Sequence, residues 1–335
     1  MFDKKNHNIM FQRSKGNEII VSVLCLTYNQ VLYVRDCLNG FVMQKTDFAF
    51  EVIVHDDAST DGTKEIIQEY ADRYPNIIKP IFETDNQYSK VGFGGIKRIV
   101  KPYLKGKYIA FCEGDDYWID SCKLQKQMQI FRENEQIDFV FTNIDYLYEE
   151  SGKRINRFLT TNGRRVSKNF SDHLFNTNFI APCTWMYKSK FFLVDDKKYV
   201  DASFVTALEI FANGKVFFLD DVTAVYRCIK ESASHSASFE KRYRHLKGVM
   251  DIKKEYIGKY RQLVNQHDID KFYVDWYGQA YRMFVAGDKK EFAEACSFFL
   301  HTHRYDKYFF YSLPKPILSY LIKLRLSLIH ISEPT

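Results

Sequence analysis

Short apolar runs alternate with segments of helical periodicity through the first half of the chain. The apolar runs are rich in β-branched residues and predict buried strands at residues 19–26, 51–55, 77–82, 107–112 and 137–142. Helical periodicity lies between these runs, at residues 31–42, at residues 62–73 and after Asp120. Because strand–helix alternation with short connections is typical of α/β proteins, we expect an open, mainly parallel, Rossmann-like central sheet covered on both faces.

The pattern changes after residue 143. Turn residues around Gly152 predict a hairpin, and apolar runs predict strands at residues 184–187, 215–219 and 222–226 with a helix at residues 204–212. From about Phe239 the chain is helical and aromatic, and Pro314 and Pro316 interrupt it near its end. We therefore expect a helical C-terminal extension beyond the sheet.

The composition is that of a folded globular protein. Of 335 residues, 46% are hydrophobic and 27% charged, which excludes disordered, collagen-like and coiled-coil classes. The net charge of +6 suits anionic small molecules or an anionic membrane surface, and it is too small to argue for nucleic-acid binding. Seven scattered cysteines without a C-x-x-C pair predict neither a disulfide framework nor a zinc site. Together with a polar N-terminus and no long apolar run, these features predict a cytoplasmic protein.

Polar residues follow three of the predicted strands. Thr27, Tyr28 and Asn29 come after the first, the pair Asp56-Asp57 after the second, and the pair Asp115-Asp116 after the fourth. In open α/β sheets, ligands bind beyond the carboxyl ends of the strands. Three polar clusters that meet at one edge of the sheet therefore predict a binding site there.

The carboxylates in these clusters allow two interpretations. On extended backbone Asp115 and Asp116 point opposite ways, so one is expected to bind Mg²⁺ or Mn²⁺ while the other reaches a neighbouring hydroxyl. Asp57 could accept the imino N–H of a pyrimidine base. The alternative is that these carboxylates only cap turns and helices, which is the common role of acidic residues at such positions.

Three motifs in order resemble those of one enzyme family. They are residues 21–29 (VSVLCLTYN), 51–63 (EVIVHDDASTDGT) and 106–118 (GKYIAFCEGDDYW), and a weaker likeness extends to about residue 236. The sequence resembles the family 2 glycosyltransferases of bacterial surface polysaccharide synthesis. Members of this family have the GT-A fold and transfer a sugar from a nucleotide-diphosphate donor with inversion.

The resemblance implies a role for individual residues. Nucleotide-binding positions would be Thr27, Tyr28, Asn29, Asp57, Asn86, Asp115 and Arg227. Within this set, Thr27 and Asp57 would contact a uracil-type base and Asp115 the ribose, while Arg227 would touch the diphosphate. Asp116 would hold the Mn²⁺ or Mg²⁺ ion that bridges the diphosphate, and His235 could complete the metal shell or lie in a solvated loop.

The general base is less clear from the sequence. The family places an Asp at a position that falls near Ser203 here, and Ser203 cannot act as a carboxylate base. We favour Asp201 as the base, with Glu209 as the second candidate. Asp201 could instead only cap the helix that follows it. Trp185 is either an aromatic platform for the acceptor sugar or a core residue.

The resemblance also divides the chain into segments. We expect an N-terminal tail (1–18), a nucleotide-sugar-binding half (19–143), an acceptor-binding half (144–237) and a helical region (238–325). Residues 326–335 (LSLIHISEPT) are identified as a translated sequencing-adapter artefact. Basic and aromatic residues after Tyr305 suit either peripheral contact with the inner face of a membrane or packing on the core.

These features favour an inverting glycosyltransferase that uses a UDP-sugar and a glycan or lipid-linked glycan acceptor. One alternative is a non-catalytic nucleotide-sugar-binding subunit of the same fold, because Ser203 stands near the expected base position. A sugar-phosphate nucleotidyltransferase is a weaker alternative, since the expected Gly-rich basic loop after the first strand is absent. No nucleic-acid partner is expected.

Overall fold

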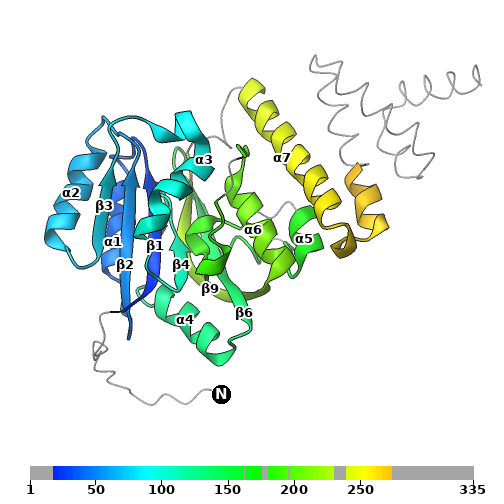
Figure 1. Ribbon diagram of the computed structural model, residues 1–335, viewed down its shortest axis with the longest axis horizontal. Helices are drawn as coiled ribbons and strands as arrows, with labels where there is room; N and C mark the ends of the chain where they lie inside the picture. Colours follow the sequence, from blue (N-terminus) through cyan, green and yellow to red (C-terminus); the bar gives the residue numbers. More distant parts are fainter. Residues whose placement is uncertain (1–17, 162, 176–179, 195–196, 230–238, 274–335) are drawn as a thin grey trace, which may run out of the picture. The chain divides into compact units, whose positions relative to one another are not determined.

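The computed structural model describes residues 18–161, 163–175, 180–194, 197–229 and 239–273 (Figure 1). The chain divides into two compact units, Met1–Ile252 and Lys253–Thr335, and all described strands belong to the first. The predicted tail, His235, residues 274–325 and the final ten residues lie outside the described residues.

The strands of the described chain form one sheet. Their bounds are β1 Ile19–Thr27, β2 Ala49–Asp56, β3 Ile78–Phe82, β4 Tyr108–Phe111, β5 Tyr117–Trp118, β6 Ile137–Tyr148, β7 Lys153–Ile155, β8 Met186–Lys188 and β9 Lys215–Cys228. The α-helices are α1 Val34–Val42, α2 Thr63–Arg73, α3 Gln87–Val100, α4 Lys123–Glu133, α5 Phe170–Phe175, α6 Ala202–Asn213 and α7 Phe239–Lys259. Single 3-10 turns are η1 Lys101–Tyr103, η2 Pro182–Thr184, η3 Ser189–Phe191 and η4 Arg261–Leu263.

The sheet has the order β3-β2-β1-β4-β8-β6-β9-β5, and β7 pairs with β6. Strands β1, β2, β3 and β4 pair in parallel, and so do β6 and β9, whereas β8, β5 and β7 pair antiparallel. Strand β1 lies between β2 and β4, so the order of the chain reverses at β1. In open α/β sheets such a reversal leaves a crevice at the carboxyl ends of the strands, where ligands bind.

The predicted α/β architecture with a mainly parallel sheet is confirmed. Two details of the prediction were wrong. The apolar runs at residues 215–219 and 222–226 form one strand, β9, whose pairing with β6 shifts register around Asn143. Helix α3 was not expected, because its sequence contains three glycines and its backbone is kinked at Gly92, where φ is +67°.

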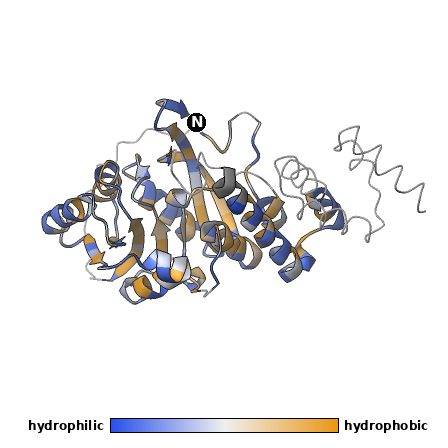
Figure 2. Ribbon diagram, turned by 90° about the horizontal axis from the view of Figure 1, so that it is seen from above, coloured by the Kyte–Doolittle hydropathy of each residue, from blue (hydrophilic) through white to orange (hydrophobic). Residues whose placement is uncertain are grey.

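The interior is apolar and aromatic. Figure 2 shows hydrophobic colouring concentrated on the strands and hydrophilic colouring on much of the helical surface. Trp185 belongs to this core, because it is 3% exposed, packs edge-on against Phe139 and donates its indole N–H to the carbonyl of Ile180 over 3.2 Å. The core interpretation of Trp185 is confirmed and the acceptor-platform interpretation was wrong. In the part of the chain that the structure describes, no helix is long and apolar enough to cross a bilayer.

Candidate donor and metal site

Hydrogen bonds between backbones bring the ends of β1, β2 and β4 side by side. Asp57 N donates to Thr27 O over 3.0 Å, and Gly114 N donates to Leu26 O over 3.0 Å. The polar residues that follow these strands therefore converge, as the topology requires. The predicted edge site thus has a geometric basis.

Thr27 is buried at the end of β1. Its hydroxyl donates to Asp56 Oδ1 over 3.1 Å, and Asp56 also accepts the hydroxyl of Ser59 over 2.5 Å. A β-carbon added at Gly114 would lie 2.5 Å from Thr27 Cγ2. Glycine is therefore required at position 114 for the following turn to approach β1 this closely.

Asp57 and Asn86 hold the start of α3. The Asp57 carboxylate accepts the backbone N–H of Gln87 over 2.6 Å and that of Tyr88 over 3.0 Å. Asn86 is the N-cap of α3 and accepts the N–H of Ser89 over 2.8 Å. Both side chains therefore cap a helix. A carboxylate has about four lone-pair sites, so these two hydrogen bonds leave Asp57 able to accept another. Base recognition by Asp57 stays a prediction.

Tyr28 and Asn29 lie in the loop after β1. Tyr28 is exposed, whereas the side chain of Asn29 accepts the N–H of Thr60 over 2.9 Å. Asn29 has a φ of +51°, in the left-handed region that asparagine tolerates. Asn29 thus joins the loops that follow β1 and β2, and Tyr28 offers an aromatic face beside them.

An acidic turn follows β4. Asp116 N donates to Glu113 O over 3.0 Å, which closes a β-turn over residues 113–116. One carboxylate oxygen from each of Glu113, Asp115 and Asp116 lies within 4.8 Å of the other two. The expectation that Asp115 and Asp116 point opposite ways was wrong, because the backbone here is a turn and not a strand.

Sequence reasoning missed Glu113. It stands in the same four-residue turn as Asp115 and Asp116, so three carboxylates so close together after a strand were an available signal.

Burial raises the pKa values of all three carboxyl groups, and the charge of Asp115 adds to this effect at Glu113 and Asp116. Burial and the charge of Asp115 raise the pKa of Glu113 to about 8. Burial raises the pKa of Asp115 to about 6, and burial with the charge of Asp115 raises that of Asp116 well above its usual range. A divalent cation among these oxygens would offset this repulsion.

Asp116 has one carboxylate oxygen in use and one available. Its Oδ1 accepts the backbone N–H of Arg227 over 2.9 Å. Its Oδ2 is buried and accepts no hydrogen bond from an N–H or O–H group of the described residues; the Cys183 thiol lies beside the carboxylate, and the residue is only 1% exposed. A buried polar atom without a partner calls for an explanation such as a bound ion. The donor set is all oxygen, so it fits Mg²⁺ or Mn²⁺.

Arg227 was expected at the diphosphate. Its guanidinium is 6% exposed and donates to Asp36 Oδ2 over 2.5 Å, and its Nη1 lies 3.5 Å from the carbonyl oxygen of Asp115. The structure thus places the guanidinium between helix α1 and the acidic turn.

Asp201 is the N-cap of α6. Its Oδ1 accepts both the N–H of Phe204 over 2.8 Å and the hydroxyl of Ser203 over 2.6 Å. Asp201 lies within electrostatic reach of the acidic turn. After burial and the charge of Asp115, its charge also contributes to the raised pKa of Glu113. Glu209 lies two turns along α6, where Glu209 O accepts the side-chain N–H of Asn213 over 2.9 Å.

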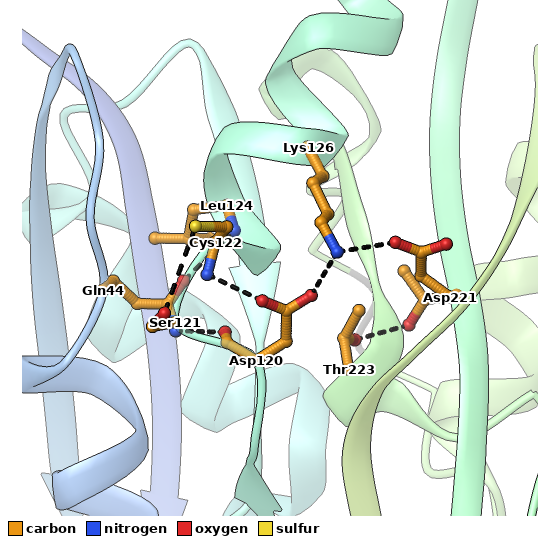
Figure 3. A network of polar contacts seen from close by, with 9 residues as sticks. Gln44, Asp120, Ser121, Cys122, Leu124, Lys126, Asp221 and Thr223 are labelled. Carbon is orange, nitrogen blue, oxygen red and sulfur yellow. Dashed lines mark hydrogen bonds and ion pairs between the residues drawn. The ribbon is translucent and has the colours of Figure 1, made fainter. Parts of the chain in front are cut away.

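A second polar network fixes the chain beyond the acidic turn (Figure 3). Lys126 lies between Asp120 and Asp221, at 2.7 Å and 2.6 Å. The side chain of Gln44 donates to Asp120 O over 2.8 Å and accepts the N–H of Leu124 over 3.2 Å. The segment between the acidic turn and α4 is therefore tied to the loop that follows α1 and to β9.

Two solved structures share the fold of this chain. TarS of S. aureus, solved with UDP-GlcNAc, aligns over 89% of this chain and 83% of its own with a TM-score of 0.57 and 19% identity. The mannosyltransferase PcManGT of Pyrobaculum calidifontis, solved with GDP-Man and Mn²⁺, aligns over 93% and 88% with a TM-score of 0.55 and 16% identity. At these identities the likeness shows the fold alone, which is the GT-A fold.

Sequence comparison gives the family. The model of glycosyl transferase family 2 matches residues 22–193, which is half of the chain, and the chain belongs to this family. An uncharacterised protein of Mycobacterium tuberculosis is 33% identical over 66% of this chain and 62% of its own length. The chain therefore spans less than two thirds of the length of these curated relatives. The Escherichia coli β-1,3-glucosyltransferase WfaP is 33% identical over 37% of this chain and 45% of its own.

Proposed function

We propose that this chain is an inverting glycosyltransferase that moves a sugar from a UDP-sugar to a glycan or lipid-linked glycan acceptor in polysaccharide biosynthesis. The observation that carries the proposal is the buried, unpartnered Oδ2 of Asp116 in an acidic turn at the carboxyl end of β4. This turn lies at the reversal of strand order, where a GT-A sheet binds its ligand.

The proposed donor is a UDP-sugar. Thr27 and Asp57 meet at the ends of β1 and β2, where a pyrimidine base would lie between buried polar side chains. The printed name of WfaP gives UDP-Glc as its donor, and TarS was solved with UDP-GlcNAc. A guanine nucleotide is the competing possibility, since PcManGT was solved with GDP-Man.

In the proposed site, Asp116 would hold a divalent cation through its free oxygen, and Asp115 and Glu113 lie close enough to take part. When bound, Mn²⁺ or Mg²⁺ would neutralise the charge that develops on the departing diphosphate. The three carboxylates would hold the cation in the turn.

Asp201 is the proposed base. Both hydrogen bonds that orient it fall on Oδ1, which leaves Oδ2 for the acceptor hydroxyl. Ser203 stands where a carboxylate was expected, and its hydroxyl donates to the Asp201 carboxylate and so helps to orient it. The acceptor oxygen bonds to the anomeric carbon while its proton passes to Asp201. The bond from that carbon to the diphosphate oxygen breaks with its electron pair on the diphosphate, which inverts the configuration.

The acceptor proposal depends on relatives. WfaP and a second E. coli enzyme, WfgD, are named for transfer to GlcNAc-diphosphoundecaprenol, which is a lipid-linked sugar. Transfer to such an acceptor would take place at a membrane surface. The basic and aromatic residues proposed for that contact lie outside the described residues.

Calorimetric titration of UDP with and without Mn²⁺ tests the donor site. We expect binding that requires Mn²⁺ in the wild-type chain and is lost in Asp116→Asn, which keeps the size and the carbonyl oxygen of the side chain. A folded wild-type chain that binds neither UDP nor GDP with Mn²⁺ would refute the proposal.

Turnover tests the base. Asp201→Asn should retain UDP binding and lose transfer by about a hundredfold or more, which is the typical contribution of a general base. The anomeric configuration of the product, measured by NMR, decides between inversion and retention. Metal-dependent UDP binding without transfer to any glycan acceptor would favour the non-catalytic subunit instead.

A further inference from the structure

Arg227 carries a buried positive charge directly behind the acidic turn. Its guanidinium carbon lies 4.5 Å from the ring centre of Tyr117 and 5.1 Å from that of Tyr33. Two carboxylates face it, Asp36 Oδ2 at 2.5 Å from Nη2 and Glu149 Oε2 at 3.5 Å from Nε. Two rings and two carboxylates therefore fix a side chain that is otherwise rich in rotamers.

The same residue holds the acidic turn from two sides. The backbone N–H of Arg227 donates to Asp116 Oδ1 over 2.9 Å, and its guanidinium lies 3.5 Å from the carbonyl oxygen of Asp115. These contacts orient the Asp116 carboxylate so that Oδ1 is in use and Oδ2 is left without a partner. The backbone N–H of Arg227 therefore decides which Asp116 oxygen is left free, and the guanidinium holds the same turn at Asp115.

Asp36 completes this arrangement from the outside. It lies on α1, is 54% exposed and makes the shortest of the polar contacts with the guanidinium. Among the described residues, Asp36 makes its polar side-chain contact with Arg227, so we expect it to act on the turn through that side chain. Partners of metal-binding residues commonly set metal affinity by tenfold or more without touching the ion.

We propose that Asp36 is a positioning residue that sets the divalent-cation affinity of the acidic turn through Arg227. This inference rests on the proposed function of the turn as a metal site and adds a residue on the opposite side of Arg227. Neither Asp36 nor the guanidinium needs to touch the donor. Loss of the Asp36 charge removes the shortest contact that holds the guanidinium, so the guanidinium can shift against the Asp115 carbonyl and displace the acidic turn, while the backbone N–H of Arg227 stays in the ladder between β9 and β6.

A neighbouring ion pair supplies a matched control. Glu69 Oε2 lies 2.7 Å from Nη2 of Arg35, the residue before Asp36 on α1, and Glu69 is 51% exposed. Glu69→Gln thus removes a carboxylate of similar exposure from an arginine pair that also involves α1, except that Arg35 is 50% exposed and Arg227 only 6%. The Arg35–Glu69 pair joins α1 to α2 and has no contact with the acidic turn in the described structure.

The experiment measures Mn²⁺ binding by the full chain in two ways. Electron paramagnetic resonance of free Mn²⁺ reports binding of the ion alone, and calorimetry reports UDP binding as Mn²⁺ is raised. We expect Asp36→Asn to raise the half-saturating Mn²⁺ concentration about tenfold. Saturating Mn²⁺ should restore UDP affinity, and Glu69→Gln should behave as the wild type in both measurements.

A double-variant cycle shows whether the effect passes through Arg227. Arg227→Met should also raise the Mn²⁺ requirement, and adding Asp36→Asn to it should cause no further change. A wild-type Mn²⁺ requirement in Asp36→Asn, or an equal rise in Glu69→Gln, would overturn the inference. So would full additivity in the double variant. If the folded wild-type chain binds neither Mn²⁺ nor UDP, the proposed function fails first.

Discussion

Gly114 is the residue on which the placement of the acidic turn depends most directly. A β-carbon at this position would lie 2.5 Å from Thr27 Cγ2 and 2.4 Å from Gln30 Oε1. Carbon atoms in contact normally stay about 3.5–4.0 Å apart, so Gly114→Ala creates an overlap of about 1 Å or more with Thr27. Gln30 can turn away, but Thr27 is buried and β-branched, and its hydroxyl is bonded to Asp56.

The overlap can be relieved only by moving the turn away from β1. Overpacking of this kind costs about 1–3 kcal/mol, and loss of the bond from Gly114 N to Leu26 O adds about 1 kcal/mol. The lower entropy of unfolded alanine returns about 0.4–1 kcal/mol. We therefore expect Gly114→Ala to lower the free energy of unfolding by about 1–3 kcal/mol. The shifted turn should also weaken Mn²⁺-dependent UDP binding about tenfold or more.

Thermal unfolding and calorimetry measure the two effects. Gly258→Ala is the matched control, because a β-carbon at Gly258 in α7 meets nothing within 4 Å. Thr27→Ser removes the clashing methyl group and keeps the hydroxyl, so it should recover part of both losses when combined with Gly114→Ala. The reasoning is refuted if Gly114→Ala behaves as Gly258→Ala does, or if Thr27→Ser recovers neither stability nor UDP affinity.

Three further predictions concern the framework around the site. Ser22→Ala removes a buried hydroxyl that donates to Glu51 over 2.8 Å and accepts two backbone N–H groups, so urea unfolding should show a loss of about 2–4 kcal/mol. The second prediction concerns the pKa of Asp138. Burial raises this pKa, but the ion pair with Lys190 outweighs burial and holds it below its usual value. The Asp138 charge therefore stabilises the fold above the unfolded pKa of about 3.9, and this contribution is lost as pH falls through the lower folded pKa. The stability difference between the wild type and Asp138→Asn should be full at pH 7 and shrink below about pH 4. Trp185→Phe should cost about 1–3 kcal/mol of stability and leave UDP affinity unchanged, whereas a loss of UDP affinity at unchanged stability would contradict its place in the core.

The sequence predicted the parallel half of the sheet well, because β1, β2 and β4 are mostly buried on both faces and appear as continuous apolar runs. Strand β9 was predicted in two pieces, since Asp220 and Asp221 interrupt its apolar pattern. The structure keeps these carboxylates within the strand by ion pairs with Arg157 at 2.6 Å and Lys126 at 2.6 Å. Such partners come from distant parts of the chain, so local periodicity could not reveal them.

In the candidate site, the sequence likewise predicted residues that are neighbours in the chain and missed contacts between distant residues. Asp115 and Asp116 were predicted because they are neighbours at the end of a strand, and Glu113 belongs to the same short turn. The contact of Asp116 with Arg227 spans 111 residues and depends on the register of β9. Neither spacing nor residue type indicated that the guanidinium would face Asp36, because only the packing of α1 brings those two groups together.

The contact between Asp116 and Arg227 also has a consequence for synthesis on the ribosome. The backbone donor for the turn is made 111 residues after the carboxylate it orients. At about 5–20 residues per second, the nascent chain carries its three acidic side chains for roughly 5–20 seconds before that donor exists. The first 143 residues alone lack this donor, so the proposed capacity to bind a cation would arise late, when most of the sheet has already been translated.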